Sequence, residues 1–71
     1  MLKETFMAKL KEARKKAGLT QQEVADKLNT SQSNITKYET GKLEPNIETI
    51  KQLAEIYKVS TDWLFDIERK W

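Results

Sequence analysis

The stretch of sequence that decides the fold is residues 19–42, LTQQEVADKLNTSQSNITKYETGK. Its first half predicts a short helix, because Thr20 occupies an N-cap position and Glu23, three residues later, completes a capping box. Apolar residues follow at helical spacing up to Leu28. Asn29 comes next, and because asparagine tolerates the left-handed conformation, it predicts a sharp turn at this point.

The second half of the stretch predicts another short helix. Ser31 is its N-cap candidate, and the helix is expected to run to about Glu39 and to stop before Gly41. Two short helices joined by a tight turn form a helix-turn-helix, and this motif commonly places its second helix in the major groove of DNA.

Three further helices are predicted around this motif. The first covers about 3–16, carries apolar residues at spacings of four, three and four, and ends at Gly18. After a loop at 40–46, Asn46 caps a helix over 47–57, and Ser60 caps a last helix. The expected apolar residues of these two helices are Ile47, Ile50, Leu53, Ala54 and Tyr57, then Trp63, Leu64 and Ile67.

No segment has the alternating pattern of a strand, because the β-branched residues are scattered. The sequence therefore predicts an all-α, compact five-helix domain. We expect this domain to occupy residues 1–67, with 68–71 as a C-terminal tail or a truncated linker.

Composition limits the chemistry that the chain can perform. The 71 residues include no cysteine and no histidine, which removes disulfides, the common metal-ligand sets and most nucleophilic dyads and triads. We expect no enzyme activity, no metal and no cofactor. The N-terminal sequence MLKETFMAKLKEARKK is too polar for a signal peptide, and no apolar run could cross a membrane, so a cytoplasmic location is expected.

The charge is unevenly distributed along the chain. The formal net charge is only +2, but residues 1–42 carry a net +4 and residues 43–71 a net −2. The positive part contains the predicted helix-turn-helix, which favours a nucleic-acid partner for it.

Four segments together resemble one known family. They are AGLTQQEVADKL at 17–28, YETGK at 38–42, PNIETI at 45–50 and VSTDWLF at 59–65. In this order and spacing they are similar to the phage-repressor/Cro-type (Xre-like) helix-turn-helix regulators, which implies the lambda-repressor-like DNA-binding fold. The sequence departs from the family at Asn29 and at Lys58, where family members usually or often have glycine.

The exposed face of the second motif helix supplies the candidate base contacts. At about 100° per residue, four polar side chains fall on one side of helix 32–39, while Ile35 and Tyr38 fall on the other and should be buried. A glutamine can bond the N6 and N7 atoms of adenine, and a lysine can reach O6 or N7 of guanine. The alternative is an ordinary solvated face. The candidates are Gln32, Ser33, Thr36 and Lys37.

Five other residues are candidates for phosphate contacts. Thr20 and Gln21 open the first motif helix, where free N–H groups and the helix dipole attract phosphate, although Thr20 could serve only as a cap. Thr40 and Lys42 follow the second motif helix, and Lys42 could simply be solvated. Asn34 lies at the edge of the exposed face, where it would contact phosphate or solvent.

The resemblance also implies a structural ion pair between Arg14 and Glu39. The pair would join the end of the first helix to the end of the helix at 32–39, fixing the orientation of the latter.

The function expected from these features is sequence-specific binding of double-stranded DNA by a transcriptional regulator, specifically a repressor. We expect a palindromic operator and a homodimer on DNA that is monomeric or weakly dimeric in free solution. Phe65 and Trp71 are the expected contacts between the two copies, and the loop at 43–47 is the alternative. The rival function is an antitoxin or other protein-interaction module on the same scaffold, whereas a small hydrolase has almost no candidate residues.

Overall fold

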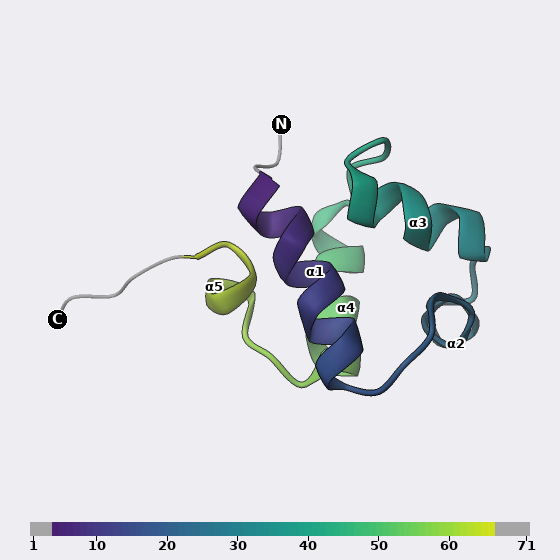
Figure 1. Ribbon diagram of the computed structural model, residues 1–71, viewed down its shortest axis with the longest axis horizontal. Coiled ribbons are helices and arrows are strands. Elements are labelled where there is room, and N and C mark those ends of the chain that lie inside the picture. The colour runs from purple at the N-terminus through teal and green to yellow at the C-terminus, as the bar shows by residue number, and fades with distance from the viewer. Residues whose placement is uncertain (1–3, 67–71) are drawn as a thin grey trace, which may run out of the picture.

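A computed structural model describes residues 4–66 of the chain, and this part is helical with no strand (Figure 1). The predicted fold class is confirmed. The helices are α1 (Glu4–Lys16), α2 (Gln21–Leu28), α3 (Gln32–Thr40), α4 (Ile47–Tyr57) and α5 (Thr61–Leu64). Among these described helices, none is long and apolar enough to cross a membrane.

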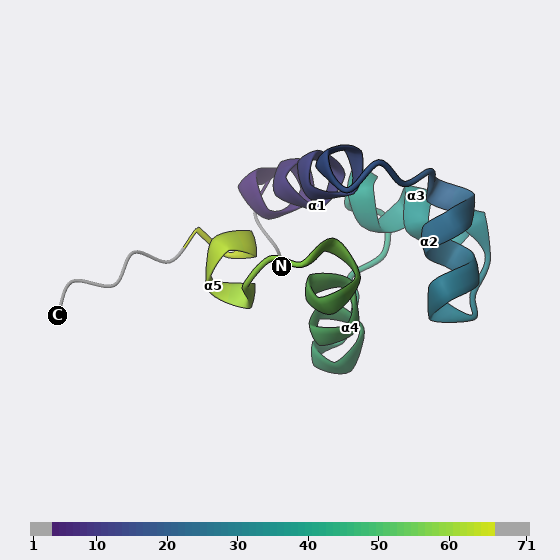
Figure 2. The same ribbon diagram turned by 90° about the horizontal axis from the view of Figure 1, so that it is seen from below.

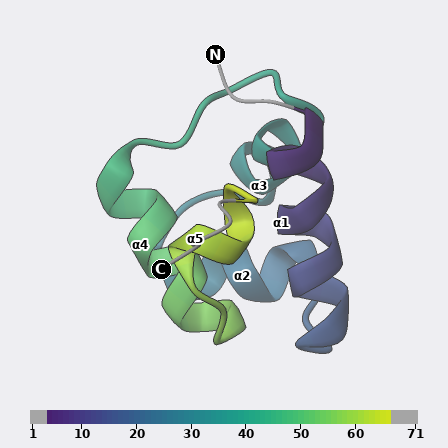
Figure 3. The same ribbon diagram turned by 90° about the vertical axis from the view of Figure 1, so that its left-hand side faces the viewer.

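The other three helices are arranged around α1 and α4. In Figure 1 α1 passes in front of α4, with α2 and α3 on one side and α5 on the other. Figure 2 shows α1 and α4 on opposite sides of the core, and Figure 3 shows α5 lying between them. α2 is seen end-on in Figure 1 while α3 lies across the view, so the two motif helices cross steeply.

Every helix contributes to one small hydrophobic core. Burying a side chain such as Leu10 or Ile35 stabilises the fold by about 1.5–3 kcal/mol, and both are 1% exposed. The buried apolar residues are Phe6, Leu10, Ala13, Val24, Ala25, Ile35, Ile50, Leu53, Ala54, Tyr57 and Leu64. Most residues of the apolar stripes predicted for the helices thus meet in a single cluster.

The predicted caps are confirmed by their hydrogen bonds. The Thr20 hydroxyl accepts from the Glu23 N–H at 3.1 Å, and the Glu23 carboxylate accepts from the Thr20 N–H at 2.8 Å. The side chains of Ser31, Asn46 and Ser60 each accept one backbone N–H and so cap α3, α4 and α5, without the reciprocal bond.

The two residues that replace family glycines both adopt the left-handed conformation. Asn29 has φ 59° and ψ 46°, and Lys58 has φ 57° and ψ 45°. Asparagine does this readily, whereas a lysine at such a position costs roughly 1 kcal/mol or more. The turn after α4 is therefore strained.

Two of the predicted burials are wrong. Ile47 is 74% exposed. It is the first residue of α4, and the buried residues of this helix begin only at Ile50. Tyr38 is only half-buried and packs against the edge of the core. The last helix is also short, ending at Leu64, and Ile67 lies outside the described residues.

Contacts from α1 hold the C-terminal end of the described chain. The Phe6 and Phe65 rings stack with centroids 4.8 Å apart. The Lys9 ammonium lies 4.6 Å from the centroid of the Trp63 ring and 3.1 Å from Oδ1 of Asp66. These contacts fix α5 against α1 despite its length of a single turn.

Candidate nucleic-acid interface

α3 presents a polar face on the outside of the molecule, and Ile35 fixes the opposite face in the core. The four candidate base contacts, Gln32, Ser33, Thr36 and Lys37, are all exposed. Ile35 is 1% exposed and packs in the core cluster. The helix therefore has one side available to a ligand and one side that holds it in place, as the angular pattern predicted.

Gln21 connects this face to the rest of the domain, a role that the sequence did not indicate. Its amide nitrogen donates to Oε1 of Glu39 at 3.1 Å. Its amide oxygen accepts from the Thr36 hydroxyl at 2.8 Å and, over a long 3.4 Å, from the Gln32 amide. The side chain expected at a phosphate is thus already bonded between α2 and α3.

The same bonds define what two of the candidates can offer to a base. Because the hydroxyl of Thr36 donates its proton to Gln21, this residue presents a methyl group and acceptor lone pairs. A methyl group of this kind suits contact with the methyl of thymine. The Gln32 amide is held only weakly and keeps both donor and acceptor capacity.

An ion pair between Arg14 and Glu39 lies behind the exposed face. Nε of Arg14 donates to Oε2 of Glu39 at 2.7 Å and Nη2 donates to Oε1 at 3.2 Å. The two side chains are 11% and 4% exposed. Nη1 also donates to the Leu19 carbonyl at 3.0 Å, so this guanidinium joins α1, the loop before α2, and α3.

Electrostatics around this pair keep Arg14 and the neighbouring Tyr57 in fixed protonation states. The hydrogen bonds to Glu39 raise the pKa of Arg14 despite its burial. Burial, reinforced by the negative charge of Glu39, raises the pKa of Tyr57 above its usual range. The arginine stays charged and the tyrosine neutral across the physiological range.

The phosphate candidates differ in what remains available on each side chain. The Thr20 hydroxyl is engaged in the cap, which leaves the opening N–H groups of α2 for an anion. The Thr40 hydroxyl donates to the Thr36 carbonyl at 2.9 Å, and the Asn34 amide donates to the Thr30 hydroxyl at 2.8 Å. Lys42 is exposed beyond the end of α3.

Comparison with known proteins places this geometry in a family. Residues 10–64 match the helix-turn-helix family, a span that includes both motif helices, the loop after them and α4. The chain belongs to this helix-turn-helix family.

Several curated helix-turn-helix regulators are similar to the chain. It is 48% identical over 56 residues to the HTH-type transcriptional regulator ImmR of Bacillus subtilis strain 168, covering 79% of this chain and 44% of ImmR. It is 36% identical over 63 residues to the HTH-type transcriptional activator BcrR of Enterococcus faecalis, covering 89% and 31%. It is 33% identical over 54 residues to the cryptic phage CTXphi transcriptional repressor RstR of Vibrio cholerae, covering 76% and 49%. The chain thus spans about half or less of each of these relatives.

The helix-turn-helix also accounts for which candidates lie together. α3 places the candidate base contacts on one exposed face. Hydrogen bonds through Gln21 and Glu39 join that face to Arg14. The resemblance implied the pair of Arg14 and Glu39, but the hydrogen bonds of Gln21 are seen only in the arrangement of the three helices. Within residues 4–66 no group of acidic side chains could hold a metal ion.

Proposed function

We propose that the chain binds double-stranded DNA sequence-specifically and regulates transcription, with α3 in the major groove. The observation that carries this proposal is the exposed polar face of α3, held in orientation by the hydrogen-bonded chain behind it. A helix that is hydrogen-bonded from behind and exposes polar side chains matches the geometry by which such motifs contact base edges. The mechanism is binding, without chemistry, and the site of action is the cytoplasm.

In this arrangement phosphate contacts would set the position of α3. The N-terminus of α2 would bind one phosphate through backbone N–H groups, with the dipole of the helix adding to the attraction. Lys42, beyond the other end of the motif, would bind a second phosphate by charge alone. Gln32, Ser33, Thr36 and Lys37 would then contact the bases.

The proposal is tested by comparing two variants on a selected binding site and on random DNA. Gln32→Ala should lose roughly 1–3 kcal/mol on the preferred site and much less on random DNA. Lys42→Ala should weaken both and lower the salt slope by about one. Gln52→Ala, an exposed glutamine on α4, is the matched control and should change neither affinity.

The rival function, an antitoxin or protein-interaction module, makes the opposite prediction. Such a module would show no sequence preference in a selection from random duplexes. Equal losses for Gln32→Ala on specific and random DNA would also contradict base recognition. The direction of regulation, which we propose to be repression as in RstR, is tested with a reporter placed behind the selected site.

For the bound form we propose a two-fold homodimer on a palindromic site, monomeric or weakly dimeric away from DNA. Among residues 4–66 the exposed large apolar side chains are Leu43, Ile47 and Phe65. A groove of about 330 Å³ includes both Ile47 and Phe65, so the two segments expected as alternatives form one surface. Trp71, the other expected contact, lies outside the described residues.

Ile47→Asp tests this interface without disturbing the core, since Ile47 is 74% exposed. An aspartate at the start of α4 is also favourable for the helix dipole. The variant should lose cooperative binding to a palindrome and keep its affinity for a single half-site. If only deletion of residues 68–71 abolishes cooperativity, the contact lies in that segment instead.

A further inference from the structure

A groove of about 550 Å³ lies where α1 and α4 end, beside the C-terminal part of α2. Its apolar lining comes from Ala17, Leu19, Ile56, Val59 and Trp63. Leu19, Ile56, Val59 and Trp63 are only partly buried, so the core leaves part of their apolar surface uncovered. The groove is large enough for one or two apolar side chains of a ligand.

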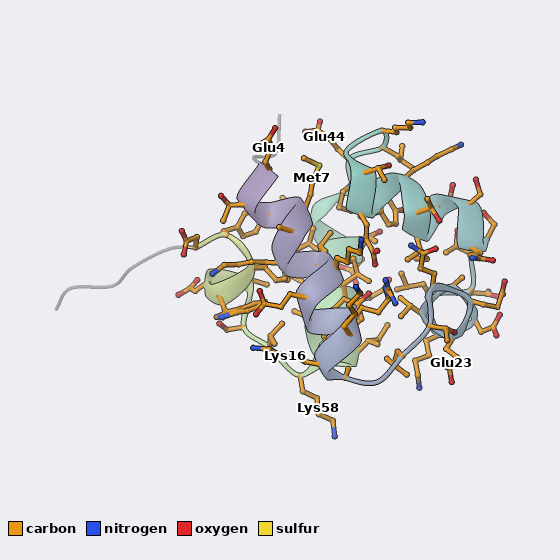
Figure 4. All side chains as sticks on the ribbon, viewed as in Figure 1. Glu4, Met7, Lys16, Glu23, Glu44 and Lys58 are labelled. Atoms are coloured by element: carbon orange, nitrogen blue, oxygen red, sulfur yellow. The ribbon has the colours of Figure 1, made fainter. Side chains whose placement is uncertain are left out.

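The charged residues that line this groove are three lysines, Lys16, Lys27 and Lys58, and they come from three different segments. Figure 4 shows Lys16 beside the end of α1 and Lys58 below it, at the same edge of the molecule. Lys16 pairs with Glu12 at 3.0 Å, but its side chain is 74% exposed, so this pair contributes little. The groove therefore joins apolar surface to positive charge.

Helix dipoles do not cancel this charge. Each of the three lysines lies at or near the C-terminus of a helix, where the dipole contributes roughly half of one negative charge. Three such ends offset only about half of the charge of the three lysines. The rim of the groove remains positive.

The groove is separate from the residues proposed to bind DNA. None of its lining residues is among the candidate base or phosphate contacts, which belong to α3, the N-terminus of α2 and the loop after α3. A ligand in the groove and DNA on α3 would therefore not compete for the same side chains.

We propose that this groove binds an acidic peptide segment of a partner protein, with an apolar anchor beside Trp63 and carboxylates at the lysine rim. Its open side favours a segment of a larger molecule over a small ligand, because a small-molecule site encloses most of its ligand. Charged rims of this kind select a partner of opposite sign and speed its association. The proposal stands apart from DNA binding, since its residues are different.

A selection from a random peptide library, displayed on phage and panned on the folded chain, tests the proposal. Enriched peptides should combine acidic residues with at least one large apolar residue. Lys16→Glu/Lys58→Glu should weaken binding of the synthesised winning peptide by about tenfold or more. The matched control, Lys11→Glu/Lys15→Glu, reverses two exposed lysines that line neither this groove nor the one beside Ile47, and should leave the affinity within about twofold.

Circular dichroism of both double variants checks that they are folded. Because the groove and the proposed DNA-binding face are separate, the peptide, the protein and DNA should form a ternary complex. Peptides enriched without acidic residues, or equal losses for the groove and control variants, would overturn the proposal. So would the absence of any enriched peptide. If sedimentation shows self-association that only the groove variant abolishes, the occupant is a second copy of the chain and the proposal is wrong.

Discussion

Removing one partner of the Arg14–Glu39 ion pair should destabilise the domain severely. Arg14→Met leaves a carboxylate that is 4% exposed, with the Gln21 amide as its remaining hydrogen-bond donor. Breaking a pair with this degree of burial costs roughly 3–5 kcal/mol. A domain of 71 residues has about 4–11 kcal/mol of stability in total. The variant should therefore lose between about a quarter and all of its stability, with a Tm at least about 12 °C lower.

A double-mutant cycle separates the pair from ordinary packing. Arg14→Met/Glu39→Leu removes both charges. Its loss of unfolding free energy should be smaller, by about 2 kcal/mol or more, than the sum of the losses of the two single variants. Urea unfolding followed by circular dichroism measures all four proteins. Single losses below about 1 kcal/mol, or strict additivity in the double variant, would refute the claim that the pair orients α3.

Three other changes have defined outcomes. Lys58→Gly should stabilise the domain by about 1 kcal/mol in urea unfolding, because glycine adopts the left-handed conformation freely; no gain would mean that the turn is unstrained. Gly41→Ala should destabilise it by about 1 kcal/mol, since φ is +80° and alanine adopts this conformation at a cost. The end of the Met7 side chain, which reaches toward this loop in Figure 4, can move aside for the added carbon. Stability should fall above about pH 10, because Tyr57 ionises in the unfolded chain while its raised pKa keeps it neutral in the folded protein. Tyr57→Phe should reduce this fall, as measured by thermal melting curves at alkaline pH.

Local chemistry was enough to predict the helices. The capping box at Thr20, the left-handed turn at Asn29 and the cap at Asn46 depend on neighbours within a few residues, and each forms in the structure. The same holds for Ile35, whose burial follows from helical periodicity. These features were predictable because the interactions that produce them are short-range.

The errors arise where tertiary placement decides. Ile47 lies on the apolar stripe of α4 by angle, but the helix begins outside the core, and no periodicity shows where along its length a helix becomes covered. Nothing in the sequence indicated that Gln21 joins α2 to α3, because the sequence does not show that Glu39 and Thr36 lie within reach of its amide. The phosphate contact of Gln21 itself stays a prediction. Whether the site residues contact DNA remains a prediction.

The unequal support of the side chains on α3 bears on how such a domain could acquire new operators. Thr36 is bonded to Gln21 at 2.8 Å, so exchanging it also alters the contacts between α2 and α3, whereas the bond of Gln32 to Gln21 is long and weak. Ser33 and Lys37 are exposed on the same helix and take no part in that bonding. Evolution, or a library built in the laboratory, could therefore vary positions 33 and 37 first at little cost in folding, position 32 next, and position 36 only together with position 21.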